Sequence, residues 1–280
     1  MHDRLARFES VSVGYRDSLV FKDLDLTLPR GRITAFCGPN GSGKSTALRA
    51  MRGLLGLDAG IVRIGERPLS EWPMKDLAKE VAMLTQAPSA PEEISVADLV
   101  MLGRFTHRKP FAGPSAEDRN AVARAIAACD LADLSERSLG ALSGGQLQRA
   151  WIAMVLAQDA PAILLDEPTN HLDIAHALDT LELIGRLKRS QNKSVVIVLH
   201  DLNLAAKYAD HMVLFRSGKI AAEGSVSNVF TQETIARVFD IDCRVIQDPQ
   251  LQRPICIPYP KRGAGLSDEP AIEDEKLATG

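Results

Sequence analysis

A glycine-rich stretch near the start of the chain has the residues of a phosphate-binding loop. Glycines let the backbone turn tightly, so that several N–H groups converge on phosphate oxygens, and the N-terminal end of a following helix adds positive charge. Lys44 would supply a point charge to the β- and γ-phosphates, and the Ser45 hydroxyl would ligate Mg²⁺. Thr46 stands where a dinucleotide-binding glycine pattern would need its third glycine. The stretch therefore predicts a nucleoside triphosphate site. It comprises Gly38, Pro39, Asn40, Gly41, Ser42, Gly43, Lys44, Ser45 and Thr46.

Two adjacent carboxylates, Asp166 and Glu167, follow the apolar run at positions 162–165. A carboxylate at the C-terminal end of a parallel strand lies in the crevice where such sheets bind ligands. Asp166 suits the coordination shell of Mg²⁺, and Glu167 suits the positioning or deprotonation of an attacking water. Such a pair is common after an apolar strand, so its chemical interpretation depends on the phosphate-binding loop upstream.

The elements that would position these residues alternate between strand and helix. Nearly continuous apolar strands separated by helices predict an α/β fold whose parallel sheet is covered on both faces. Alternation of apolar and polar residues predicts further short strands over 4–29, and capping-box spacing predicts a helix that starts at Ser115. Buried strands are predicted at 33–37, 81–85, 162–166 and 195–200, and helices at 95–102, 142–158 and 174–187.

The composition excludes several classes of protein. The 280-residue chain has a net charge of −3, which does not suggest nucleic-acid binding. Its four cysteines show no metal-binding or disulfide spacing, which favours a reducing, cytoplasmic compartment. The longest apolar run, 150–157, is far shorter than the ~20 residues of a membrane span. We therefore expect a cytoplasmic protein that is free to associate with membrane partners.

A second glycine pair lies nearly a hundred residues beyond the first loop, in the run Leu142-Ser143-Gly144-Gly145-Gln146. Ser143 and Gln146 have capping-box spacing, and a glycine-rich helix N-terminus can hold an anion. With this run the chain resembles the ATP-binding cassette (ABC) ATPases, whose signature it matches at every position. The resemblance covers roughly residues 5–258. It implies a head-to-tail dimer in which the signature of one subunit completes the ATP site of the other.

Further motifs of that family fall in order along the chain. By resemblance, Tyr15 would stack on adenine, Gln86 would touch Mg²⁺ and take part in catalysis, and His200 would contact the γ-phosphate. Residues 170–173 match the D-loop that ends at Asp173, with His171 where many relatives have a small residue. The other five histidines are interpreted as structural.

The resemblance also implies the domain organisation. Residues 1–85 and 161–262 would form the nucleotide-binding core with an antiparallel β subdomain, and residues 86–160 a helical subdomain that carries the signature. Residues 263–280, rich in Gly, Ala, Asp and Glu, are expected to form a disordered tail.

The single cassette, without membrane helices or a long coiled coil, favours an importer subunit. The run Leu102-Gly103-Arg104-Phe105-Thr106-His107-Arg108 resembles the ATPases of ferric-siderophore and cobalamin importers. The resemblance implies a subunit on the inner face of the cell membrane that binds ATP, a second copy of itself and a permease, and indirectly serves a substrate-binding protein. Ferric-siderophore uptake is the favoured function. The alternatives are cobalamin or haem import, and a soluble ATPase of iron–sulfur cluster assembly.

A basic cluster follows the same run and consists of Arg104, His107, Arg108 and Lys109. Two interpretations stay open at this point. The cluster could face the permease or anionic lipid head groups, or it could be an ordinary solvated loop.

Overall fold

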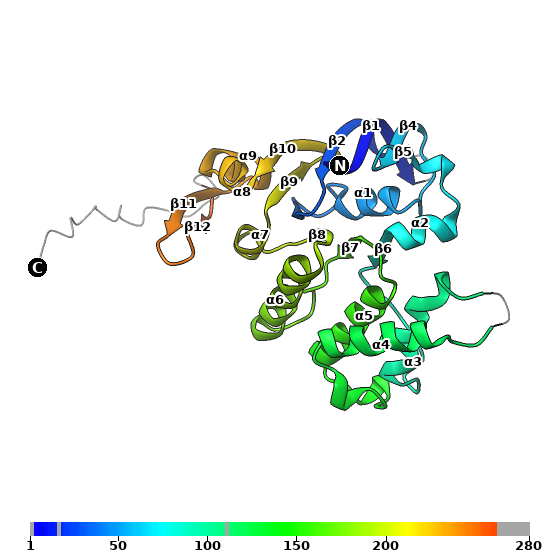
Figure 1. The fold of residues 1–280 in the computed structure, drawn as a ribbon. Coiled ribbons are helices and arrows are strands. Elements are labelled where there is room, and N and C mark those ends of the chain that lie inside the picture. Colours follow the sequence, from blue (N-terminus) through cyan, green and yellow to red (C-terminus); the bar gives the residue numbers. More distant parts are fainter. Residues whose placement is uncertain (1–2, 16–17, 110–111, 262–280) are drawn as a thin grey trace, which may run out of the picture.

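The computed structural model describes residues 3–15, 18–109 and 112–261. Strands and helices alternate along most of this length, and helices α3, α4, α5 and α6 lie on one side of the central sheet, with α1 on the other (Figure 1). The strands are β1 (Arg4–Tyr15), β2 (Ser18–Pro29), β3 (Ile33–Cys37), β4 (Ala59–Ile64), β5 (Arg67–Pro68), β6 (Val81–Leu84), β7 (Ala162–Asp166), β8 (Ser194–Val198), β9 (His211–Arg216), β10 (Lys219–Ser225), β11 (Asp242–Asp248) and β12 (Arg253–Tyr259). The α-helices are α1 (Lys44–Met51), α2 (Met74–Glu80), α3 (Val96–Leu102), α4 (Ala116–Ala128), α5 (Gly144–Ala157), α6 (Ile174–Gln191), α7 (Leu202–Tyr208), α8 (Val226–Val229) and α9 (Gln232–Phe239). Four short 3₁₀ helices are η1 (Leu69–Glu71), η2 (Gly103–Thr106), η3 (Ala132–Leu134) and η4 (Leu139–Ala141).

The central sheet has the strand order β10-β9-β3-β8-β7-β6. Neighbouring strands from β9 to β6 run parallel, and β10 pairs antiparallel with β9 at the edge. The predicted parallel sheet is therefore confirmed. Because parallel strands end at one edge, the segments that follow β3, β7 and β8 come together there.

Side chains of these strands alternate between two hydrophobic clusters, one on each face of the sheet. Phe36, Leu164 and Val196 pack on the face that carries α1 and the antiparallel sheet. Ala35 and Ile197 pack on the opposite face, together with residues of α3, α4, α5 and α6. Burial on both faces explains why the strands read as nearly continuous apolar runs.

A second sheet of four antiparallel strands, in the order β2-β1-β4-β5, covers the α1 face. Its register pairs Phe8 with Leu26 across β1 and β2, so the alternating apolar residues of both strands point into one core. The strands predicted over residues 4–29 are longer in the structure than the sequence pattern suggested, with 12 residues each. Irregularities in the pairing explain why the alternation breaks along β1.

The helical part of the chain contains α3, α4 and α5 (Figure 1). The capping boxes predicted at Ser115 and Ser143 are both present, at the starts of α4 and α5. The domain boundaries predicted at residues 86 and 160 stay a prediction.

The basic cluster is not a single exposed patch, because Arg104 is buried. Its Nε donates a hydrogen bond to Asp118 Oδ1 at 2.9 Å, and its Nη1 donates to the Ala157 carbonyl oxygen at 2.9 Å. Arg104 thereby ties η2 to the start of α4 and the end of α5. His107 Nε2 lies 2.8 Å from the Gln158 carbonyl oxygen, so it too is engaged. An interpretation of Arg104 as a surface charge is therefore wrong.

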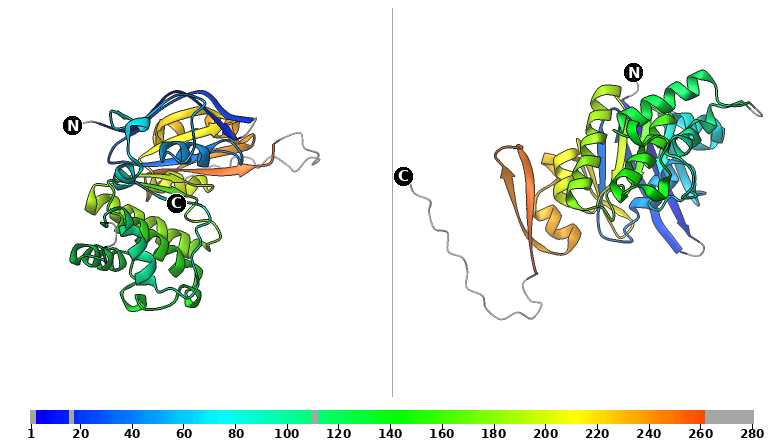
Figure 2. Two further views of the ribbon diagram at one scale, coloured as in Figure 1. Left: turned by 90° about the vertical axis from the view of Figure 1, so that its right-hand side faces the viewer. Right: turned by 90° about the horizontal axis from the view of Figure 1, so that it is seen from below.

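The C-terminal hairpin of β11 and β12 lies on the side of the molecule away from α3, α4 and α5 (Figure 2). Asn203 in α7 holds it: its amide donates to the Cys256 carbonyl oxygen, and its carbonyl accepts from the Cys256 N–H. The tail predicted at residues 263–280 lies outside the described residues. Within the described ranges no helix has the length and hydrophobicity that a membrane crossing requires.

Candidate functional site

The glycine-rich loop connects β3 to α1, as the sequence predicted, and its shape requires glycine at two positions. At Gly38, where φ is 147°, a Cβ atom would lie 2.2 Å from the Phe215 carbonyl oxygen. At Gly43, where φ is 108°, it would lie 2.3 Å from the ring of Phe21. Gly43 is also the N-cap of α1 and offers no side chain to its first N–H groups. This helix start is therefore open to an anion.

The Lys44 side chain folds back across this loop and is buried. Its Nζ donates to the carbonyl oxygens of Gly38 and Pro39, at 2.8 and 2.9 Å. Burial lowers the pKa of the Lys44 ammonium, while Glu167, among other neighbours, acts in the opposite direction. A phosphate beside Nζ would raise the pKa of Lys44 again, because its negative charge stabilises an ammonium group that burial has removed from water.

The carboxylate of Asp166 lies beneath the loop at the end of β7. The Ser45 hydroxyl donates to its Oδ1 at 2.7 Å, while Oδ2 is buried without a hydrogen-bond partner among the described residues. Burial raises the pKa of Asp166, and the bond from Ser45 opposes that rise. An orphaned carboxylate oxygen beside a hydroxyl fits a hard divalent cation, which prefers oxygen ligands. The residues present therefore fit Mg²⁺.

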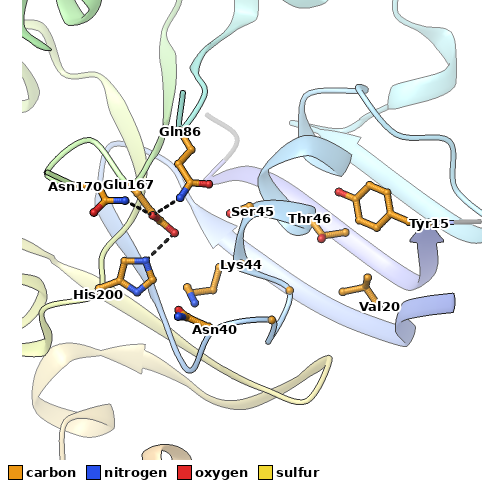
Figure 3. Close-up of a pocket in the computed structure, with 12 residues that line it drawn as sticks. Tyr15, Val20, Asn40, Lys44, Ser45, Thr46, Gln86, Glu167, Asn170 and His200 are labelled. Atoms are coloured by element: carbon orange, nitrogen blue, oxygen red, sulfur yellow. Dashed lines mark hydrogen bonds and ion pairs between the residues drawn. The ribbon is translucent and has the colours of Figure 1, made fainter. Parts of the chain in front are cut away.

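Glu167 lies at the meeting point of three segments (Figure 3). Gln86, just after β6, donates from Nε2 to Glu167 Oε2 at 2.6 Å, and Asn170 Nδ2 donates to the same oxygen at 3.1 Å. His200 Nε2 lies 2.7 Å from Glu167 Oε1. Both carboxylate oxygens are thus held in place.

The backbone of Glu167 is itself unusual, with φ at 54°, in the left-handed region that favours glycine. A non-glycine residue in such a conformation is strained, and strain of this kind gathers at functional sites. The turn directs the Glu167 side chain, 10% exposed, toward the pocket.

Lys44, Ser45 and Glu167 line one pocket of about 720 Å³, within the range of small-ligand sites. Tyr15 and Val20 lie at its far end from Glu167, with Lys44 between (Figure 3). The Tyr15 hydroxyl accepts a hydrogen bond from Arg49 at 3.3 Å, which orients the half-exposed ring. The predicted site residues that line the pocket are Tyr15, Asn40, Gly41, Gly43, Lys44, Ser45, Thr46, Gln86, Glu167 and His200.

Two lining residues, Val20 and Asn170, were not predicted as site residues. Asn170 belongs to the D-loop run, so the motif itself was the signal that could have found it. Val20 lies on a strand whose pattern carries no sign of ligand contact. Four predicted residues do not line the pocket but bond to residues of the loop: Gly38 and Pro39 accept from Lys44, Asp166 accepts from Ser45, and the Ser42 N–H donates to the Pro39 carbonyl oxygen.

The remaining predicted residues lie outside this pocket's lining, on the starts of two other helices. Ser143 accepts a hydrogen bond from the Gln146 N–H, and Gln146 Oε1 accepts one from the Ser143 N–H. Gly144 and Gly145 form the first positions of α5, and Asp173 caps α6. Within one chain, the signature and the phosphate-binding loop therefore do not form a single site.

Comparisons with known proteins identify the class. A family model described as ABC transporter matches residues 21–170. The "Probable siderophore transport system ATP-binding protein YusV" of Bacillus subtilis is 44% identical over 264 residues, which cover 94% of this chain and 96% of that protein. The ferric enterobactin transport ATP-binding protein FepC of Escherichia coli is 40% identical over 252 residues, which cover 90% and 93%. A dimeric ATP-binding cassette, MJ0796 bound to ADP and Pi in a post-hydrolysis state, is 26% identical, with a TM-score of 0.69 and coverage of 79% and 98%.

The chain therefore belongs to the ABC transporter family. Its nearly full-length similarity to ATP-binding proteins of transport systems makes it an ATPase subunit of such a system. The nucleoside triphosphate predicted from the glycine-rich loop is accordingly ATP, and the predicted ABC-type fold is confirmed.

Proposed function

We propose that this chain hydrolyses ATP to drive the import of a ferric siderophore through a membrane permease. The observation that carries the proposal is the similarity, at 40 to 44% identity over nearly the whole chain, to ATP-binding proteins of siderophore and ferric enterobactin transport. The ATPase does not contact the transported compound, so the proposed cargo rests on sequence similarity to these relatives.

In the proposed mechanism the loop and α1 bind the phosphates. Lys44 is pre-positioned by its bonds to two loop carbonyl oxygens, and the open helix start presents N–H groups. Ser45 and Asp166, with Gln86 beside them, would hold Mg²⁺, which supplies charge neutralisation to the phosphate oxygens when bound. Tyr15 would stack on the adenine at the far end of the pocket. Most of this site acts through charge and orientation.

Glu167 is proposed to act on water. Its carboxylate is oriented by Gln86, Asn170 and His200, so an attacking water that donates to it would be held in a fixed direction. As the water oxygen bonds to the γ-phosphorus, the bond from that phosphorus to the β–γ bridging oxygen would break and release ADP, and a proton of the water would pass to the Glu167 carboxylate. His200, 44% exposed and at the pocket's edge, would also contact the γ-phosphate.

Two copies of the chain are proposed to share two ATP molecules, head to tail. The separation of Ser143–Gln146 and Asp173 from the phosphate-binding loop supports this arrangement, because these helix starts need a ligand from another chain to serve an ATP site. The similarity to a dimeric cassette structure supports it as well.

The permease is proposed to dock in a groove of about 890 Å³ between α2 and η2. Met74 and Phe105 are 73% and 76% exposed, and they offer an apolar contact. Among the described residues, the charged side chains that line the groove are all basic, namely Arg52, Lys75, Arg108 and Lys109. A permease segment with apolar and acidic side chains would match it. Two members of the predicted basic cluster, Arg108 and Lys109, would thus face the partner.

This arrangement would place the chain in the cytoplasm, on the inner face of the cell membrane, where the permease presents its cytoplasmic segments. A substrate-binding protein on the opposite side would deliver the iron chelate to the permease. Contact between that protein and this chain would be indirect.

Uptake by cells that lack the gene tests the proposal. Uptake of radiolabelled ferric siderophores should fall, and the restored gene should recover it, whereas a gene encoding Lys44→Ala should not. Normal uptake of every ferric siderophore together with a loss of cobalamin or haem uptake would move the assignment to that cargo. Normal uptake of all these compounds with impaired iron–sulfur enzymes would instead favour cluster assembly.

A further inference from the structure

Near its start at the signature, helix α5 makes a very close contact with α6, between Gly145 and His176. A Cβ atom built on Gly145 would lie 2.2 Å from His176 Cδ2 and 2.8 Å from its Cγ. The neighbouring Gly144 has no atom within 4 Å of the corresponding position. The His176 ring therefore lies directly against the backbone of the signature at residue 145.

Asp173, the N-cap of α6, fixes this ring in place. His176 Nδ1 lies 2.8 Å from Asp173 Oδ1, and the His176 backbone N–H donates to the same oxygen at 2.9 Å. The ring cannot rotate away from Gly145 without losing its contact to Asp173. The His176 side chain thus contacts the start of α5, at Gly145, and the start of α6, at Asp173.

We propose that His176 is a positioning residue that locks the signature, Ser143–Gln146, to Asp173, so that both are presented to the partner chain's ATP as one rigid unit. The inference rests on the proposed dimer with shared ATP sites. It assigns a role to a histidine that the sequence pattern left as structural.

The contact also explains the residue at position 145. Gly145 is the second residue of α5, where alanine is still a better helix former than glycine, and its backbone is not in the left-handed region. Backbone conformation therefore does not require glycine here. Glycine is required because the His176 ring occupies the space that a side chain at position 145 would fill.

Thermal unfolding of the full chain without nucleotide tests this packing. Gly145→Ala should lower the Tm when His176 is present and raise it when His176 is replaced by alanine. This reversal of sign is expected because helix propensity favours alanine over glycine at position 145 once the ring is gone. A Gly145→Ala effect of equal sign and size in both backgrounds would overturn the proposal.

Function is tested with His176→Ala, His176→Asn and the matched control Asp179→Asn. Asparagine at position 176 keeps a donor at the place of Nδ1 and so can still bond Asp173. Asp179 is exposed one turn further along α6. Binding of a fluorescent ATP analogue by the monomer should change less than twofold in all three. Turnover should fall about tenfold or more in His176→Ala and stay near the parental value in the other two.

Dimerisation is measured by light scattering with Mg-ATP in chains that also carry Glu167→Gln. His176→Ala should weaken the dimer at least tenfold, and His176→Asn should restore it. Parental dimerisation and turnover in His176→Ala would overturn the proposal. If chains with Glu167→Gln alone fail to dimerise, the shared-site proposal fails instead, while the sign of the Gly145→Ala effect still tests the contact.

Discussion

Replacement of Glu167 by glutamine should separate ATP hydrolysis from ATP binding. The substitution preserves size but removes the basic carboxylate that would accept the proton of water. General-base contributions are typically ~10²–10⁴-fold, so turnover should fall by roughly that factor. At about 1.4 kcal/mol per factor of ten, this corresponds to about 3–5.5 kcal/mol of lost transition-state stabilisation.

The effect on binding can be judged from the contacts of Glu167. Three side chains approach its two oxygens, namely Gln86, Asn170 and His200. In glutamine the amide oxygen can keep the bonds from Gln86 and Asn170, and the amide nitrogen then faces His200 Nε2, which accepts a bond in one neutral tautomer. Loss of the His200 contact would carry a net cost of ~0.5–1.5 kcal/mol. Affinity for ATP should therefore change by no more than about tenfold, and removal of a negative charge near the γ-phosphate acts in the favourable direction.

Single-turnover hydrolysis and equilibrium ATP binding measure the two effects separately. Glu233→Gln, at an exposed position on α9, is the matched control and should hydrolyse at the parental rate. Light scattering should show a stable dimer of Glu167→Gln with Mg-ATP and none with ADP. Parental turnover in Glu167→Gln would refute the assignment, and the water would then have to be oriented by His200 or Gln86.

Three further predictions concern the partner site, the groove and the buried ion pair. Ser143→Arg should bind ATP as a monomer but abolish hydrolysis, and mixing it with Lys44→Ala should restore one working site per heterodimer; heterodimers without activity would contradict shared sites. Phe105→Glu should reduce permease-stimulated ATPase activity and transport at least tenfold while the isolated chain keeps its basal rate, whereas Leu251→Glu, on the hairpin turn, should change neither; unchanged transport in Phe105→Glu would exclude the groove. Hydrogen bonds from Ser115, followed by the contact with Arg104, lower the pKa of Asp118 to about 2, so its contribution to stability is present above about pH 4 and is lost as the pH falls toward 2. Asp118→Asn should lower the Tm at pH 7 and reduce the stability lost between pH 4 and 2, and an unchanged acid profile would contradict this.

Local sequence patterns predicted the elements that carry the site. The capping boxes at Ser115 and Ser143 depend on side chains three residues apart, so their helix starts could be recognised without knowledge of the fold. The phosphate-binding loop between β3 and α1 was recognisable for the same reason. The capping boxes and the bonds from Lys44 to Gly38 and Pro39 each lie within a few residues, whereas the packing of Gly38 and Gly43 against Phe215 and Phe21 could not be read from the motif.

Features that depend on distant contacts were not predictable in this way. The apolar run before His200 suggested a strand up to that residue, but β8 ends at Val198. On the β7 side the pairing stops at Val198, because its partner Asp166 is the last residue of β7; on the β3 side only the Leu199 N–H continues it, with a bond to the Phe36 carbonyl oxygen. The burial of Arg104 likewise depends on α4 and α5, and the ring of His176 against Gly145 depends on how α5 and α6 pack.

The left-handed backbone at Glu167 has a consequence for directed evolution. Glycine, or asparagine, would adopt that turn with less strain, so where this relief exceeds the loss of the contacts to Gln86, Asn170 and His200, a chain selected for folding alone gains stability by giving up the carboxylate. Libraries screened by heat challenge should accumulate Gly or Asn at position 167 and lose turnover as they become more robust. Selection for a more thermostable form of this protein therefore has to include ATP hydrolysis and heat resistance in the same round.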